Sequence, residues 1–174
     1  MREVFMSRVV EIPVPDNSSL FCQLKKTDFC DAYRVSLSKP QLSVHDAYIA
    51  VFRDPPSWVN TLMSVRGVIA TVFGLKHEAS GGFLEENYQV GQRIGLFTVQ
   101  SITTNELIVG DNDTHLDFRI SVLKSSIQGI ETVTVSTAVE IHNRVGRLYM
   151  LLVKPFHRFI ARLMLQRAAN AGRL

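Results

Sequence analysis

The segment from residue 91 to residue 142 alternates apolar and polar residues, and this period of two constrains the fold more than any other feature of the chain. Successive side chains of a β-strand point to opposite faces of a sheet, so the alternation predicts strands with one buried face. We expect strands over residues 93–102, 106–110, 115–124 and 131–142. Turns at residues 103–105 and 125–130 would join them into an antiparallel meander.

The preceding residues predict one further strand and two helices. Asp31–Ser38 alternates in the same way, and Pro40 ends it. Ser43 and Asp46 resemble a capping box, which predicts a helix that runs to about Phe52. Apolar residues spaced four and three apart predict a second helix over residues 58–72, and residues 84–90 allow another strand.

Residues 144 to about 169 predict a long helix, kinked where Pro155 interrupts it. Its expected core-facing stripe consists of Val145, Tyr149, Leu152, Phe156, Phe159 and Leu163. An apolar helix that follows a meander can bury this stripe across the concave side of a curved sheet. We therefore predict an α+β fold, with a curved antiparallel sheet wrapped around the C-terminal helix and two short helices after the first strand. Residues 31–174 would form one domain, with residues 1–30 as an extension packed on it.

Positive charge is concentrated in the C-terminal helix. The 174 residues carry a net charge of +3, but residues 144–174 contain seven basic residues and no acidic one. The basic side chains that share a broad face are Arg147, Lys154, Arg158 and Arg162. A solvated helix face is the favoured interpretation, and weak contact with an anionic membrane surface is the alternative. Nucleic acid is not an expected partner, because aromatic residues do not interleave with these charges.

Composition indicates an ordered protein of the cytoplasm. Hydrophobic residues make up 46% of the chain, which excludes wholesale disorder. Cys22 and Cys30 match neither a redox pair nor half of a zinc site, so a reducing compartment is expected. No signal peptide is recognisable in residues 1–7, and no apolar run approaches the ~20 residues of a membrane span.

The most polar stretch of the chain, residues 111–119, holds the candidate chemistry. Asp113, His115, Asp117 and Arg119 would share one strand face, and a hairpin pairing residues whose numbers sum to 255 would place His115 opposite Glu140. A histidine flanked by carboxylates suits acid–base chemistry, whereas a solvated face with cross-strand ion pairs is the simpler interpretation. No further His or Cys completes a ligand set, so we expect no metal and no cofactor.

Other candidate residues carry weaker signals. His77 and Glu78 precede a glycine loop that is either a surface loop or a mobile lid. His157 is expected to bond a backbone carbonyl freed by Pro155, and the alternative is a polar group that lines a pocket. The chain contains neither G-x-S-x-G nor a P-loop motif.

Several motifs carry a family resemblance. The order of elements resembles the helix-grip fold of the START/polyketide-cyclase-like (SRPBCC) superfamily, whose members hold hydrophobic ligands between sheet and helix. The motifs D-x-H-L-D-F-R at residues 113–119 and G-R-L-Y-x-x-L-V-x-P-F-H-R-x-I at residues 146–160 resemble a bacterial family of unknown function. W-V-N-x-L-M-S-V-R at residues 58–66 and F-G-L-K at residues 73–76 fit the same family. The resemblance covers roughly residues 28–170.

Together these features favour a binding protein over an enzyme. The expected ligand is a hydrophobic small molecule or lipid in a cavity between the sheet and the C-terminal helix. The residues expected to line that cavity are Phe97, Phe118, Val135, Tyr149, Leu152 and Phe156. One alternative is a cyclase, hydratase or isomerase that uses His115 and Asp117, and another is a peripheral membrane or protein-interaction module that uses the basic helix.

Overall fold

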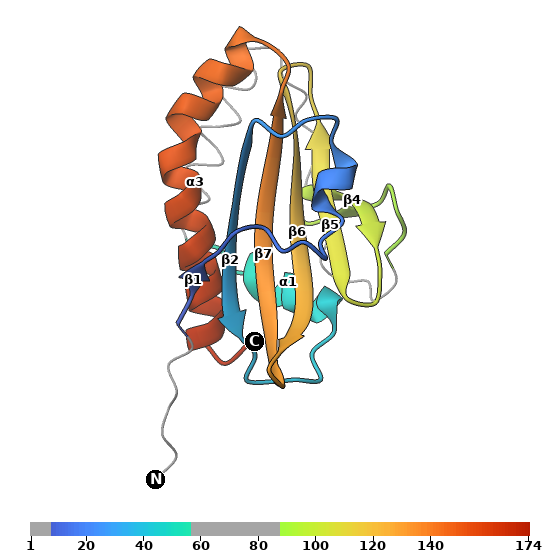
Figure 1. Ribbon diagram of the computed structural model, residues 1–174, viewed down its shortest axis with the longest axis vertical. Helices are drawn as coiled ribbons and strands as arrows, with labels where there is room; N and C mark the ends of the chain where they lie inside the picture. Colours follow the sequence, from blue (N-terminus) through green and yellow to red (C-terminus); the bar gives the residue numbers. More distant parts are fainter. Residues whose placement is uncertain (1–7, 57–87) are drawn as a thin grey trace.

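The computed structural model describes residues 8–56 and 88–174, which form one antiparallel sheet with α-helices packed on one face (Figure 1). The second helix, the His77–Glu78 loop and the first four residues of the strand allowed at residues 84–90 lie outside the described residues. Within the described residues 88–90 there is no strand.

The sheet has seven strands in the order β1-β2-β7-β6-β5-β4-β3, which confirms the predicted curved antiparallel sheet of an α+β fold. The strands are β1 (Val10–Glu11), β2 (Phe29–Ser36), β3 (Arg93–Ile94), β4 (Phe97–Ile102), β5 (Glu106–Asn112), β6 (Leu116–Ile127) and β7 (Ile130–Ile141). A 3-10 helix, η1 (Leu20–Gln23), precedes β2; α1 (Val44–Phe52) follows β2, and α3 (Arg144–Asn170) follows β7.

Two turns differ from the sequence-based expectation. Residues 93–102 form a hairpin rather than one strand, because Gly95 adopts a φ of 59° and reverses the chain between β3 and β4. The β6–β7 turn consists of only Gln128 and Gly129, with φ of 51° and 79°. Positive φ at both central residues is the signature of a type I′ turn, whose twist matches that of the strands. The paired strands consequently extend into the predicted loop.

The two faces of the sheet are covered by different parts of the chain. The main core lies on the face that α1 and α3 cover, where Tyr33, Val135 and Met164 share one apolar cluster. The opposite face is covered by the segment between β1 and β2, which crosses the strands in Figure 1. Glu106 ties this segment down, since its buried carboxylate accepts hydrogen bonds from Ser18 Oγ at 2.5 Å, Ser19 N at 2.9 Å and Ser121 Oγ at 2.6 Å.

α3 is continuous through Pro155 but buries a different side from the predicted one. Its buried residues are Gly146, Met150, Met164, Leu165 and Ala168. Leu152, Phe156 and Phe159, expected to face the core, are exposed, so the predicted stripe is wrong at these positions. Gly146 and Ala168, with the flexible Met150 and Met164, allow the helix to lie close to β2 and β7, and Leu165 is fully buried among them.

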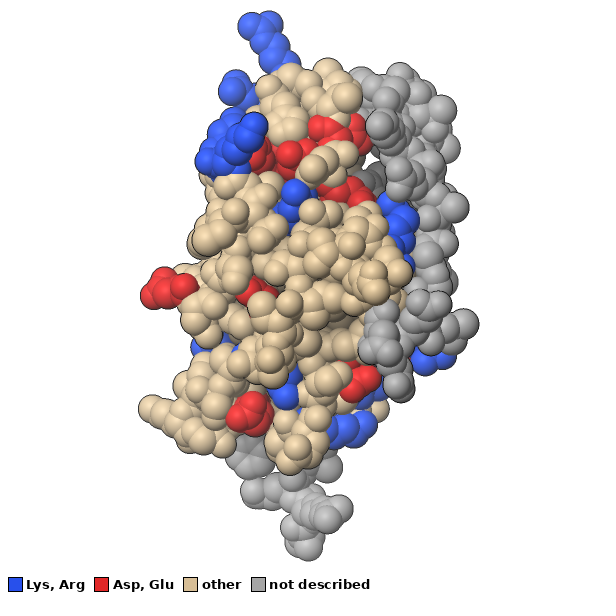
Figure 2. Space-filling view, turned by 90° about the vertical axis from the view of Figure 1, so that its right-hand side faces the viewer, with Lys and Arg blue, Asp and Glu red and all other residues tan. Residues whose placement is uncertain are grey.

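Uncharged side chains occupy much of the middle of the face shown in Figure 2, and most of its charged side chains lie toward the two ends or along the margins. Acidic groups collect near its upper end, where β7 leads into α3 (Figures 1 and 2). Among the described residues, no helix has the length and apolar character needed to cross a membrane.

Candidate functional site

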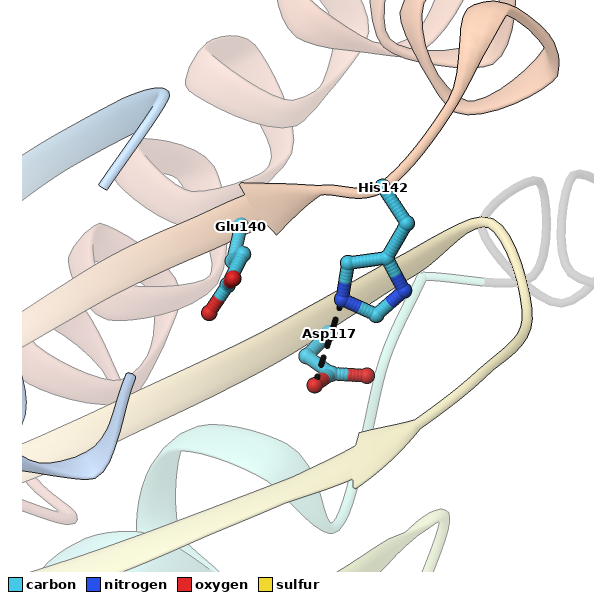
Figure 3. Close-up of side chains that lie close together, drawn as sticks. All are labelled: Asp117, Glu140 and His142. Carbon is cyan, nitrogen blue, oxygen red and sulfur yellow. Dashed lines mark ion pairs between the residues drawn. The ribbon is translucent and has the colours of Figure 1, made fainter. Parts of the chain in front are cut away.

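Three side chains with metal-binding chemistry meet where β6 begins and β7 ends. Asp117 on β6 lies directly opposite Glu140 on β7, and His142 follows one residue after the end of β7. His142 Nε2 lies 3.4 Å from Asp117 Oδ2 (Figure 3). One ligand atom from each of the three residues lies within 4.8 Å of the others, and the described residues contain no second such group.

Backbone amides hold both carboxylates of this Asp117–Glu140–His142 cluster. Asp117 Oδ1 accepts a hydrogen bond from Asp113 N at 3.1 Å, and Glu140 Oε2 accepts one from Lys25 N at 3.0 Å. Glu140 is 8% exposed, and Asp117 is half-buried. Each carboxylate is thus oriented through one oxygen, and its second oxygen is left for another partner.

Arg119 lies beside this cluster on the same face of the sheet. Its Nη1 donates to the carbonyls of Asp111 and Phe118, and its Nη2 donates to Asn112 Oδ1 at 2.7 Å. Burial lowers the pKa of the Arg119 guanidinium, and the nearby carboxylates of Asp117, Asp111 and Glu140 oppose this shift. Arg119 therefore supplies a fixed positive charge beside the two acids.

His115 takes a different partner. Its Nδ1 lies 2.8 Å from Nδ2 of Asn143, the residue whose side chain caps the N-terminus of α3. The residue numbers of paired positions on β6 and β7 sum to 257, so the expected pairing of His115 with Glu140 is wrong. The two-residue difference preserves which side chains share a face, and it follows from the position of the Gln128–Gly129 turn. Asp113, Asp117, Arg119 and Glu140 remain near one another, but Asp117 contacts His142 instead of His115.

A second polar group lies beneath α3. Asp31 on β2 has a side chain that is only 1% exposed, and its Oδ1 lies 3.4 Å from His157 Nε2. The same His157 nitrogen lies 3.1 Å from Thr137 Oγ1, so His157 binds side chains of the sheet and not a backbone carbonyl freed by Pro155. Burial, followed by the charge of Asp31, raises the pKa of the neighbouring Tyr33 to about 12.

The residues expected to line a cavity separate into buried and exposed groups. Phe97 and Val135 are buried in the main core, and the Phe97 ring contacts the half-buried Phe118 ring edge-on at 5.6 Å. Tyr149 is half-buried against a small cluster that contains Phe29 and Met150. Leu152 and Phe156 are more than half exposed, so they lie on the surface of α3.

One protein-family model matches most of the chain. A model of a family described as a protein of unknown function, DUF2867, matches residues 23–164. The chain belongs to the DUF2867 family. A search of curated proteins finds no match. The DUF2867 match includes the Asp117–Glu140–His142 cluster and the Asp31–His157 pair, so both lie in the part of the chain that the family model covers.

Two functional candidates, His142 and Asp31, were not among the site residues predicted from sequence. The signal for His142 is its alternation with Glu140, because residues two apart on a strand share a face. That signal points to Asp117 only when the hairpin register is known. Asp31 carries no comparable signal, since its partner His157 is 126 positions away and on a helix.

Proposed function

We propose that the protein binds a hydrophobic small molecule or a lipid through the N-terminal half of α3. The observation that supports this function is an exposed apolar face on that half of the helix. Its large side chains are between 54% and 73% exposed: Leu148, Leu151, Leu152 and Phe156 lie in that half, and Phe159 continues the face just beyond the midpoint of the helix. Soluble domains rarely expose contiguous apolar patches unless these contact a ligand, membrane or partner.

The position of this face relative to the sheet supports a ligand beside the helix. Tyr149, Leu152 and Phe156 are spaced three and four apart, so they follow one side of α3. Tyr149 and Phe118 both pack at the edge of the small cluster around Phe29, Val139 and Met150. An apolar ligand on Leu152 and Phe156 would therefore continue toward Tyr149 and Phe118, with the Tyr149 hydroxyl as a polar contact.

The neighbouring side of the helix suits an acidic headgroup. Arg147, Lys154 and Arg158 are exposed, and among the described residues none of them forms an ion pair with an acid. Cations beside an apolar stripe are the arrangement that binds amphiphiles and anionic lipid surfaces. The resemblance to START-like proteins, which hold hydrophobic ligands between sheet and helix, supports the same ligand class.

Two measurements would test this function: binding of a fluorescent fatty acid, and sedimentation of the protein with lipid vesicles. We expect the wild-type protein to bind the fatty acid, and the double variant Leu152→Ser/Phe156→Ser to bind at least about tenfold more weakly. Burial of one such side chain contributes about 1.5–3 kcal/mol, and 1.4 kcal/mol corresponds to tenfold in affinity. The matched control is Ile127→Ser/Ile130→Ser, which removes two exposed apolar side chains at the β6–β7 turn.

The vesicle arm identifies the source of the lipid. Binding of the monomeric fatty acid without sedimentation on vesicles indicates a small-molecule ligand. Salt-sensitive sedimentation on anionic vesicles, and none on zwitterionic vesicles, indicates a membrane surface. If the wild-type protein binds neither probe, or if both double variants bind equally well, the proposed function is wrong.

A further inference from the structure

We infer that Asp117, Glu140 and His142 form a binding site for a divalent transition-metal ion of the Zn²⁺ class. This site lies on the sheet face opposite the main core that α1 and α3 cover, and it is independent of the proposed lipid binding. The three side chains are brought together by one pair of neighbouring strands, with Asp117 opposite Glu140 and His142 beyond the end of β7 (Figure 3).

The distance between His142 and Asp117 fits two ligands of one ion better than it fits a hydrogen bond. A charge-assisted N–H···O bond is about 2.7–2.9 Å long, whereas His142 Nε2 and Asp117 Oδ2 are 3.4 Å apart. Zinc binds nitrogen at about 2.0–2.1 Å and carboxylate oxygen at about 2.0–2.2 Å, so two ligands at tetrahedral positions lie roughly 3.4 Å apart. One ligand atom of each of the three residues lies within 4.8 Å of the others. A small side-chain movement would therefore bring Glu140 to bonding distance of an ion held by Asp117 and His142.

The carboxylates are oriented as metal ligands usually are. Asp113 N holds Oδ1 of Asp117, and Lys25 N holds Oε2 of Glu140. Outer contacts of this kind fix the direction of ligands in metalloproteins. Glu140 is more than nine-tenths buried as a residue, but its Oε1 is not among the buried atoms that lack a partner, and the described residues provide no hydrogen bond to it, so it is open to an incoming ion.

The ligand types select the class of metal. Imidazole with carboxylates suits zinc and related transition metals, whereas Ca²⁺ requires six to eight oxygen ligands. Arg119 lies beside the acids and offsets part of their negative charge, which opposes the binding of any divalent cation equally, so the imidazole ligand favours the transition metal. Three protein ligands leave a fourth position for water, as in zinc sites that remain open to a substrate.

Competition with a chromogenic zinc chelator would test this site in the 174-residue chain after bound metal has been removed. We expect one Zn²⁺ per chain, with affinity at least about tenfold lower in His142→Ala, because loss of outer contacts alone costs 10–100-fold. Asp117→Asn keeps the size of the side chain and is expected to show the same loss. His115→Ala is the matched control, since His115 lies at the same end of the sheet and contacts Asn143.

A thermal unfolding experiment provides a second readout. Zn²⁺ should raise the midpoint for the wild-type protein and for His115→Ala, but not for His142→Ala, because an ion that binds only the folded state stabilises it. Equal affinity for Zn²⁺ in the wild-type protein and in His142→Ala would overturn the inference. A measured ratio other than one Zn²⁺ per chain would also overturn it. Stronger binding of Ca²⁺ than of Zn²⁺ would also contradict it. Failure of lipid binding leaves these outcomes unaffected.

Discussion

The Asp31 carboxylate is a buried charge whose environment depends on one helix residue. Its side chain is 1% exposed, and its contacts are His157 Nε2 at 3.4 Å and the Tyr33 hydroxyl at 3.4 Å. Both distances are long, and Oδ1 has no hydrogen-bond donor among the described residues. His157 is additionally fixed by Thr137 and by an edge-on contact with the Phe29 ring. The His157 imidazole and the Tyr33 hydroxyl are therefore the polar groups that contact the Asp31 carboxylate beneath α3.

Removal of that imidazole should destabilise the fold. We expect His157→Ala to lower the free energy of unfolding by about 1–3 kcal/mol, because the buried Asp31 carboxylate is left with only the 3.4 Å contact of the Tyr33 hydroxyl. The double variant Asp31→Asn/His157→Ala should recover part of this loss, since a neutral amide costs less to bury than a carboxylate. Urea unfolding of the two single variants and the double variant gives the coupling energy. Strictly additive effects would contradict the interaction between Asp31 and His157.

At the scale of elements, Gly146 controls how closely α3 approaches the sheet. A Cβ at this position would lie 2.2 Å from the carbonyl oxygen of His115, an oxygen that also accepts the amide of His142. The helix therefore begins in contact with the backbone where β6 starts and β7 ends. This contact fixes the start of α3 next to the Asp117–Glu140–His142 cluster.

Gly146→Ala should destabilise the protein, although alanine has a higher helix propensity than glycine. Alanine stabilises an exposed helix by about 1 kcal/mol relative to glycine. Here the added methyl group meets backbone that cannot rotate away, so we expect destabilisation of about 1–3 kcal/mol. Leu151→Ala on the exposed side of α3 is the control and should change stability by no more than about 0.5 kcal/mol. A more stable Gly146→Ala protein would contradict the close approach.

Sequence patterns located the elements better than they located the contacts between them. The period of two placed β4 to β7 and their faces, because alternation reports burial directly. It could not place the two-residue turn at Gln128–Gly129 within the expected six-residue loop, so the register was two residues out. Because of this error the expected register paired Glu140 with His115, whereas in the structure Glu140 pairs with Asp117.

Sequence periodicity also failed to identify which side of the C-terminal helix is buried. Two sides of α3 carry apolar residues, and size favoured the side with Leu152, Phe156 and Phe159 as the buried one. The side that faces the sheet begins with Gly146 and ends with Ala168, where small side chains permit close packing. Helical periodicity cannot rank two apolar sides, because the choice depends on the surface that the helix meets.

At the scale of the whole molecule, α3 has two roles along its length. Its C-terminal half completes the main core through Met164, Leu165 and Ala168. Its N-terminal half packs through Met150 on a smaller cluster and leaves large apolar side chains exposed. The fold is thus stabilised mainly at one end of the helix, and the other end is available for the proposed lipid.

Two buried tyrosines of the main core, Tyr33 and Tyr48, make the stability of the whole protein depend on alkaline pH. Burial raises the pKa of Tyr33 to about 12, and burial raises the pKa of Tyr48, whose hydroxyl donates to the carbonyl of Ile94. In the unfolded chain both hydroxyls titrate near 10.0, so above that pH the folded state retains protons that the unfolded state has lost. The corresponding stability is complete below pH 10 and is lost as the pH rises toward 12.

Tyr33→Phe should make this alkaline loss smaller while changing stability little at neutral pH, because the hydroxyl of Tyr33 has only a 3.4 Å contact with Asp31. The measurement is the free energy of unfolding in urea at a series of pH values between 7 and 11, for wild type and variant. The ionisation of lysine side chains affects both proteins equally, so the difference between the two curves isolates Tyr33. Curves that remain parallel above pH 10 would show that Tyr33 does not contribute to the alkaline unfolding of the core.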